Sequence, residues 1–219
     1  MTDLAPPFDA FGVHYERALR TPTGPVVLRD AAGSAGTRHD VGRYLGDADA
    51  VERRLARELP GPVLDIGCGP GRMVRAAREA GREALGVDVS EAATRIARRR
   101  GIPVWHGSVF DVLPDEGAWG TALLLDGNIG IGGDPAELLT RCRNLLRARG
   151  TVVVEVHPDP RRDRRFHAVL TDENGNAGAT FPWAEVGRRA LRRHARRAGL
   201  VRAREWHAGI RWFAEYHRS

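Results

Sequence analysis

The chain has 219 residues, 42% of them hydrophobic and 28% charged. This composition is typical of a globular domain and argues against a disordered chain, and the length suffices for one domain with a sizeable core. All 34 basic residues are arginine, and the formal net charge is +6. Arginine clusters at 98–100, 161–165 and 188–197 leave a nucleic-acid partner open, although such runs are more often solvated helix faces.

Cysteine and histidine usage bears on the compartment and on metals. Cys68 and Cys142 are too few for a disulfide framework, and neither they nor the eight histidines show metal-ligand spacing. The N-terminal residues lack the basic start and apolar core of a secretory signal, and no apolar run reaches membrane-spanning length. We therefore expect a cytoplasmic protein with no metal site and no membrane anchor.

The first 60 residues are expected to cover the core of the fold. A helix is predicted over residues 8–19 and a short strand over 25–29. A second helix is predicted over 50–59, where Asp49 can act as the N-cap and Pro60-Gly61 ends the helix. The sequence leaves the role of residues 20–45 open.

From residue 62 the chain alternates short apolar runs with amphipathic stretches, a pattern typical of a parallel sheet covered on both faces. Ser90 and Asp134 are predicted N-caps, and each helix is predicted to end at a glycine. The fold class is therefore predicted to be α/β, with a doubly wound, mostly parallel sheet. Strands are predicted over residues 62–66, 83–89, 102–107, 121–126 and 151–157, and helices over 73–81, 90–101 and 134–150.

Residues 158–219 are expected to add an insert and a closing pair of strands. Residues 158–181 are predicted to form a hairpin or lid around a turn at 172–178, followed by a helix over 183–199. Two strand-like segments, 200–209 and 210–217, are joined so tightly that they must be antiparallel. We expect a single domain over 1–219, made of a cover (1–60), a ligand-binding core (62–157), the insert, and the C-terminal helix and strand pair (182–219).

Residues 63–72 read VLDIGCGPGR, a glycine-rich loop that follows a strand and opens a helix. Backbone amides in such a loop face a ligand at the carboxyl end of the sheet, and glycine is required where a side chain would block that approach. A Walker-type phosphate loop is excluded because the chain has no lysine. The dinucleotide fingerprint is a poor match, because Arg72 stands where its third glycine belongs.

The loop resembles the first motif of the class I S-adenosylmethionine-dependent methyltransferases, an acidic residue followed by three alternating glycines. The resemblance covers residues 62 to about 157 and implies a Rossmann-like methyltransferase fold with S-adenosyl-L-methionine as cofactor. The resemblance implies these cofactor contacts: Asp65, Gly67, Cys68, Gly69 and Gly71 in the loop, Asp88 and Val89 at the ribose, Val109, Phe110 and Asp111 at the adenine, and Asp126 and Gly127 at the methionine end. Two of these residues could have a structural role instead: Asp88 could cap the next helix, and Phe110 could be an ordinary core residue.

Methyl transfer in this family is an in-line displacement, for which the protein aligns the reactants and excludes water. A base is useful only when the acceptor holds its proton firmly. The resemblance suggests three catalytic candidates: His157 after the fifth strand, Asn128 after the fourth, and Tyr15, beside His14, in the N-terminal helix. His157 could instead be a structural or surface histidine. Tyr15, Trp105 or Phe110 could lie near the sulfonium, and the glycines at 130–133 could admit backbone to the ligand or act as a plain connector.

The acceptor is expected to be a small molecule. The chain has no appended RNA-binding domain, and no Asn-Pro-Pro-Tyr or Asp-Pro-Pro-Tyr tetrapeptide follows the fourth strand. One alternative is an RNA methyltransferase or nucleic-acid binder that uses an arginine-rich face. Another is a non-catalytic S-adenosylmethionine-binding protein. The acceptor atom and the oligomeric state are left open by the sequence.

Overall fold

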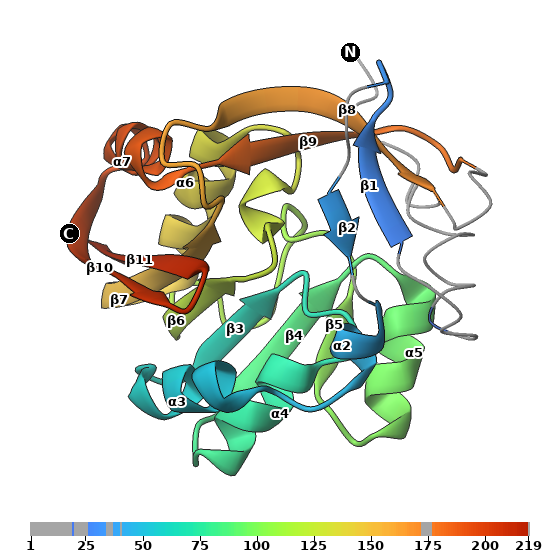
Figure 1. Ribbon diagram of the computed structural model, residues 1–219. Coiled ribbons are helices and arrows are strands. Elements are labelled where there is room, and N and C mark those ends of the chain that lie inside the picture. Colours follow the sequence, from blue (N-terminus) through green and yellow to red (C-terminus); the bar gives the residue numbers. More distant parts are fainter. Residues whose placement is uncertain (1–18, 20–25, 34–36, 40, 172–176, 219) are drawn as a thin grey trace.

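Strands of the computed structural model form a sheet of seven strands and a sheet of four, within the described residues 19, 26–33, 37–39, 41–171 and 177–218 (Figure 1). The larger sheet has the order β10-β11-β7-β6-β3-β4-β5. Its strands are β3 (Val63–Ile66), β4 (Ala84–Asp88), β5 (Val104–His106), β6 (Trp119–Leu124), β7 (Leu146–Val156), β10 (Leu200–Ala208) and β11 (Arg211–Arg218).

The five strands from β3 to β7 are parallel, whereas β11 is antiparallel to both of its neighbours, β7 and β10. The predicted α/β class, with a mostly parallel sheet and an antiparallel C-terminal pair, is confirmed. The chain runs outward from β3 through β4 to β5 and then returns to β6 on the other side of β3. A crevice opens at such a reversal, outside the carboxyl ends of the strands, and ligands bind there in open α/β sheets.

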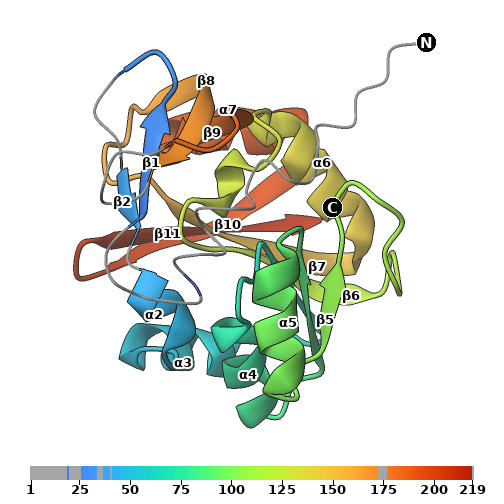
Figure 2. The same cartoon turned by 90° about the vertical axis from the view of Figure 1, so that its right-hand side faces the viewer.

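Helices cover both faces of the large sheet (Figures 1 and 2). Period-two alternation along β6 divides the apolar side chains: Leu123 packs toward α3, α4 and α5, and Leu124 packs toward α6 and α7. Each face therefore has its own hydrophobic core. The helices are α2 (Val41–Leu45), α3 (Ala50–Glu58), α4 (Arg72–Glu79), α5 (Glu91–Arg99), α6 (Pro135–Leu145) and α7 (Arg188–Arg197), with a short 3-10 helix η2 (Asn128–Gly130) after β6.

Side chains cap three of these helices at the predicted positions. Asp49 accepts a hydrogen bond from the Glu52 amide and completes a capping box at α3, and Ser90 accepts one from the Ala93 amide at α5. Asp134 accepts from two amides at α6, where proline occupies the first turn. These caps satisfy backbone donors that would otherwise lack partners, so the helix starts follow from local sequence.

Two predicted helix boundaries are wrong. The helix predicted over 134–150 ends at Leu145, because Leu146 pairs with Trp119 of β6 and begins β7. The helix predicted over 183–199 begins at Arg188, because Trp183 pairs with Phe166 in a strand. In both segments strand pairing and burial override helix propensity.

The smaller sheet is antiparallel throughout and has the order β2-β1-β8-β9. Strand β1 corresponds to the strand predicted at 25–29. Strand β8 lies in the predicted insert (158–181), whereas its partner β9 begins at the last residue of the insert and runs into the segment predicted as a helix. The predicted helix over 8–19, apart from Leu19, and most of the turn at 172–178 lie outside the described residues. The strands are β1 (Val26–Asp30), β2 (Thr37–His39), β8 (Asp163–Thr171) and β9 (Phe181–Val186).

Two glycines let the segment after β6 pack directly on β9. A Cβ at Gly130 would lie 2.3 Å from the Ala184 carbonyl oxygen and 2.6 Å from the Trp183 ring. A Cβ at Gly133 would lie 2.9 Å from Pro182. The backbone at Gly130 and Gly133 therefore lies close to β9. This contact holds the small sheet against the end of β6.

We predict that Gly130→Ala lowers the free energy of unfolding by about 1–3 kcal/mol, the usual cost of overpacking a tight contact. Urea denaturation measures the change. Gly46→Ala is the matched control, because its Cβ would make only ordinary contacts, 3.5 Å or more from the nearest atoms. Equal losses in the two variants would contradict the close approach at Gly130.

Candidate functional site

A cavity opens at the carboxyl ends of β3, β4 and β6, at the point where the strand order reverses. The space within it, counted out to its mouth, is about 990 Å³. One side consists of the glycine-rich loop and the strand ends that follow it. The other side consists of side chains from β1, β8 and β9, so both sheets contribute to the cavity.

The glycine-rich loop is held in a conformation that only glycine adopts easily. Gly67 and Gly69 have φ angles of 70° and 55°, and both line the cavity with Cys68. A Cβ at Gly67 would lie 2.6 Å from the Asn128 side-chain nitrogen. Gly71, with a φ of 87°, does not line the cavity; a Cβ there would meet Ile102. The first two predicted glycines thus face the ligand space, and the third permits close packing.

Asp88 joins the end of β4 to the glycine-rich loop. Its carboxylate accepts hydrogen bonds from the Gly69 amide at 2.7 Å and the Ser90 amide at 2.8 Å. Burial raises the pKa of this carboxyl above its ordinary value. Ser90, rather than Asp88, caps α5, so the capping alternative for Asp88 is wrong. Asp88 and Val89 both line the cavity.

Of the three residues predicted to contact the adenine, only Val109 lines the cavity. Val109 is buried and lines the cavity, and Gly107 lines it nearby. Phe110 does not line the cavity and is 40% exposed, so its reading as an ordinary core residue is wrong. Asp111 is also exposed and outside the lining, and its carboxylate accepts a hydrogen bond from the Ser108 amide.

The Asp65 carboxyl lies buried in β3, at the base of the loop. It accepts no hydrogen bond from the described part of the chain, and the carboxylates of Asp126, Asp88 and Glu52 lie near enough to disfavour its charge. Burial is the largest cause that raises the pKa of Asp65 to about 7, and the charge of Arg72 opposes it. The Asp65 carboxyl therefore titrates near neutral pH.

A buried ion network, missed by the sequence reasoning, lies beside the loop. Arg72 at the start of α4 donates to both carboxylate oxygens of Glu52, at 3.0 and 3.2 Å, and also contacts Asp126. Glu52 is 1% exposed; burial raises its pKa, but the hydrogen bonds and charge of Arg72 lower it to about 2. Arg43 of α2 pairs with both Glu52 and Asp126. The available signal was Arg72 itself, which follows the third glycine directly.

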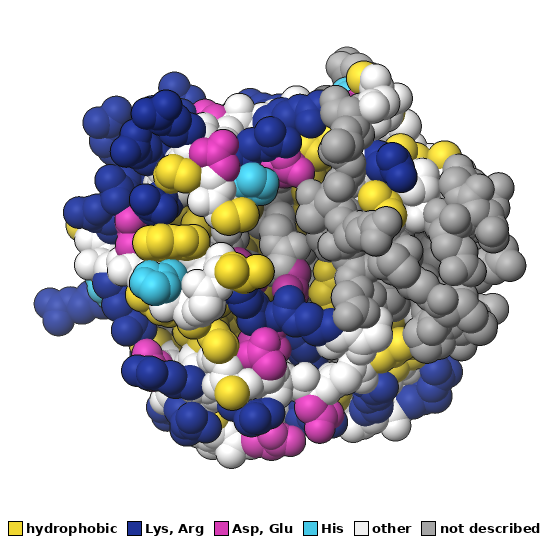
Figure 3. All heavy atoms as spheres, viewed as in Figure 1, with side chains coloured by type: hydrophobic (Ala, Val, Ile, Leu, Met, Phe, Trp, Pro, Cys, Tyr) yellow, Lys and Arg dark blue, Asp and Glu magenta, His cyan; other side chains and the backbone are white. Residues whose placement is uncertain are grey.

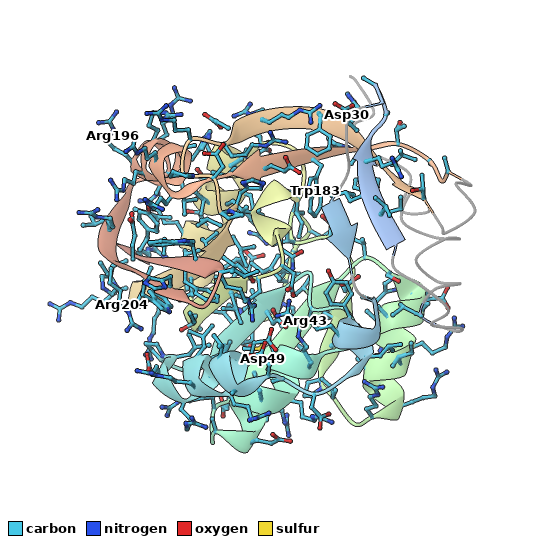
Figure 4. The ribbon with its side chains drawn as sticks, viewed as in Figure 1. Asp30, Arg43, Asp49, Trp183, Arg196 and Arg204 are labelled. Atoms are coloured by element: carbon cyan, nitrogen blue, oxygen red, sulfur yellow. The ribbon has the colours of Figure 1, made fainter. Side chains whose placement is uncertain are left out.

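The network continues to the C-terminal strand pair. Arg211 of β11 binds Glu155 of β7 through two hydrogen bonds of 2.8 Å, and Glu155 accepts the Asp126 amide at 3.0 Å. Arg211 also lies 3.2 Å from Asp49 and from Glu52. Figure 4 shows Arg43 and Asp49 on the side of α2 and α3, facing the end of the large sheet. These ion pairs thus link α2, α3, α4, β7 and β11 beside the cavity.

Asn128 and its neighbours connect β6 to the glycine-rich loop. The Asn128 amide nitrogen donates to the Ile66 carbonyl at 2.8 Å and to the Gly67 carbonyl at 3.0 Å. Asp126 and Asn128 line the cavity, whereas Gly127 does not. Asp126 has a φ of 52° and Gly127 one of 85°, so the chain turns sharply after β6.

The other predicted catalytic candidate within the described residues, His157, lies away from the cavity. His157 is half-buried and outside the cavity lining; its backbone amide bonds to Val186, and its Nδ1 accepts the Asp159 amide at 3.1 Å. Tyr15 and His14 lie outside the described residues. Trp105 is 41% exposed and does not line the cavity. Tyr44 of α2, which the sequence reasoning did not single out, does line it.

Within the described part of the chain, no group of three or more His, Cys, Asp or Glu residues is arranged to hold a metal ion. No described helix is both long and apolar enough to cross a membrane. Cys68 and Cys142 are buried and unpaired.

A family model described as a methyltransferase domain matches residues 38–203. The chain belongs to this family. The predicted membership of the class I S-adenosylmethionine-dependent methyltransferases is confirmed, and S-adenosylmethionine, the predicted cofactor, is the cofactor of the family. A search of curated protein sequences found no significant match.

Solved structures of methyltransferases share the fold. An S-adenosylmethionine-dependent methyltransferase from Bacteroides fragilis, in complex with S-adenosyl-L-homocysteine, has a TM-score of 0.72 and 19% identity, over 98% of this chain and 97% of that one. The CcbJ methyltransferase from Streptomyces caelestis has a TM-score of 0.60 and 17% identity, over 79% and 91%. The 1,6-didemethyltoxoflavin-N1-methyltransferase from Burkholderia thailandensis has a TM-score of 0.56 and 18% identity, over 78% and 80%.

The pKa of Asp65 leads to a prediction about stability. Because it is raised to about 7 from 3.8, the folded state binds more protons than the unfolded state between these pH values, and stability is lost as pH rises through them. Asp65→Asn should therefore gain stability relative to the parent as pH rises from 4 to 8, by up to about 4 kcal/mol, at roughly 1.4 kcal/mol per pKa unit. Urea denaturation of the ligand-free protein across this range measures the difference. A difference that does not change with pH would contradict the raised pKa.

Proposed function

We propose that the chain transfers the methyl group of S-adenosylmethionine to a small-molecule acceptor by in-line displacement. The observation that carries the proposal is the cavity itself, which joins the glycine-rich loop and Asp88 on one side to an apolar wall on the other. Cofactor and acceptor would then share one cavity. Such a space aligns the reactants and keeps water away.

The residues on the loop side suit this cofactor. Gly67 and Gly69 leave backbone uncovered where the cofactor would approach, and a side chain at Gly67 would collide with Asn128. The Asp88 carboxylate lines the cavity and keeps acceptor capacity for ribose hydroxyls beyond its two amide bonds. Val109 offers an apolar contact for the adenine. When bound, the cofactor supplies an electrophilic methyl group on a sulfonium.

Preorganisation of the loop is the main contribution of this chain to the reaction that we propose. The Asp88 bond to the Gly69 amide and the two Asn128 bonds to loop carbonyls hold the loop without help from a ligand. Asn128 would then act as a positioning residue. The base role of His157 and the role of Tyr15 remain predictions from the sequence. The described residues that line the cavity include no histidine.

Several observations favour a small acceptor over a nucleic acid. The arginines of α7 gather over the outer side of that helix, and Arg196 points away from Trp183 (Figures 3 and 4). Arg162 pairs with Glu185, and Arg192 pairs with Glu205. None of the arginines at 161–165 and 188–197 lines the cavity. The structural neighbour from Burkholderia thailandensis holds a small molecule, 1,6-didemethyltoxoflavin. We also propose a cytoplasmic location, which rests on the cysteine content.

Labelled-methyl transfer tests the proposed reaction. The purified chain is incubated with S-adenosylmethionine carrying a labelled methyl group and with the small-molecule extract of the source organism or its total RNA. Label in a small molecule is the expected result. Label in RNA alone would favour the nucleic-acid alternative. Binding of S-adenosylhomocysteine without transfer to either fraction would favour a non-catalytic binding protein.

We predict that Asp88→Ala weakens the binding of S-adenosylhomocysteine by about 5- to 150-fold, which corresponds to roughly 1–3 kcal/mol for hydrogen bonds to a charged group. Isothermal titration calorimetry measures the dissociation constant. Asp159→Ala removes an exposed carboxylate outside the cavity and serves as the control. An unchanged dissociation constant in Asp88→Ala would move the ribose contact to another residue.

We also predict that Gly69→Val abolishes measurable binding of S-adenosylhomocysteine, because the new side chain would occupy the ligand space and resist a φ of 55°. Gly81→Val is the matched control: Gly81 has a φ of 77°, lies outside the cavity, and has open space at its Cβ position. The control suffers similar backbone strain and should still bind. Retained affinity in Gly69→Val would count against the cofactor assignment.

A further inference from the structure

We propose that the acceptor is a neutral, planar aromatic compound, and that Trp183 and its neighbours on the small sheet form the surface against which its ring packs. The inference rests on the proposed function and concerns the half of the cavity that lies opposite the glycine-rich loop. None of the residues of this half is among the cofactor-binding or catalytic residues predicted from the sequence.

The wall opposite the loop is apolar and comes from three strands and the segment after η2. Leu28 of β1, Leu170 of β8, Trp183 of β9 and Ile131 all line the cavity. Leu28, Leu170 and Trp183 are only 5–7% exposed, because they also pack in one hydrophobic cluster with Leu19, Ala92 and Phe181. The apolar surface that they present to the cavity gains from a ligand that displaces water from it.

Charged side chains line the cavity on the opposite side, and their partners are already supplied by the protein. Arg72 binds Glu52 and Asp126, and the Asp88 carboxylate accepts two backbone amides. Tyr44 stays a neutral phenol, because burial and the charge of Asp126 raise its pKa. An ionic group on the acceptor would have to compete with these contacts or remain without a partner. This cost favours a neutral acceptor.

Trp183 is held in place by its surroundings. Its ring makes an edge-to-face contact with Phe181, with centroids 5.9 Å apart and an interplanar angle of 87°. The backbone at Gly130 packs so closely that a Cβ would lie 2.6 Å from the indole. In Figure 4 Trp183 lies on the small-sheet side, opposite Arg43 and Asp49. An indole fixed in this way offers a rigid surface, which planar rings match better than flexible or puckered groups.

The test uses three defined probes against protein saturated with S-adenosylhomocysteine: quinoline, which is neutral and planar; 2-decalol, which is neutral but saturated; and quinoline-2-carboxylate, which is charged. Dissociation constants are measured by NMR titration. We expect quinoline to bind at least fivefold more tightly than either of the others. Equal binding of 2-decalol would overturn the planar aromatic class, and tighter binding of the carboxylate would overturn the neutral class.

Trp183→Ala should weaken quinoline at least fivefold and leave the dissociation constant of S-adenosylhomocysteine within twofold of the parent. Trp183→Phe keeps a flat ring and should stay within about threefold of the parent for quinoline. Trp212→Ala is the matched control, because Trp212 is half-buried on β11 and outside the cavity. Unchanged quinoline binding in Trp183→Ala would overturn the assignment of the wall.

A measurement on the parent keeps the test independent of folding in Trp183→Ala. In protein labelled with 5-fluorotryptophan, the signal absent from Trp183→Phe identifies Trp183 among the five tryptophans. Quinoline should shift this signal more than the other four, and a larger shift at any other tryptophan would overturn the proposal. Failure of S-adenosylhomocysteine to bind the parent would instead count against the proposed function.

Discussion

A guanidinium buried at the reversal of the strand order is the constraint on which the rest of the site depends. Arg72 is 6% exposed, and a buried charge is tolerated only when it is paired and hydrogen-bonded. Burial lowers its pKa, but the charge of Asp126 and the hydrogen bonds to Glu52 raise it overall, so the side chain stays charged. Because its partners lie on α3 and at the end of β6, the network sets the position of α4 relative to both. Arg211 extends the same constraint to β7 and β11 through Glu155.

The cavity has two halves that are held in different ways. On the loop side, backbone amides and carbonyls are fixed by Asp88 and Asn128, so the surface depends on a few hydrogen bonds. On the other side the surface is made of apolar side chains from a sheet whose strands come from residues 26–39 and 163–186. The first kind of surface suits one cofactor, because backbone geometry is hard to vary. The second kind can be varied by substitution without disturbing the large sheet, and this is the half where we place acceptor choice.

Much of the fold and part of the site could be predicted from short-range features. The caps Asp49, Ser90 and Asp134 act within one turn of their helices, so local sequence suffices for them. The glycine-rich loop was recognisable because its spacing reflects contact with a ligand. In contrast, Trp183 was assigned to a helix, and Gly130 and Gly133 were read as a connector or as room for a ligand. The positions of Trp183 and of the two glycines depend on the pairing of β8 with β9 and on the approach of that hairpin to the end of β6. A short stretch of sequence predicts neither the pairing nor the approach.

The sequence by itself determined the α/β class, the parallel direction of the central strands, and the loop that marks the methyltransferase family. These follow from periodicity, capping and spacing, which act over a few residues along the chain. The tertiary structure alone decided which charges are paired, how deeply Asp65 is buried, and that β1 joins β8 to form the second wall of the cavity. Burial and ion pairing depend on residues that lie far apart in the chain, such as Glu52, Arg72, Asp126 and Arg211. No single segment of the sequence therefore predicts them.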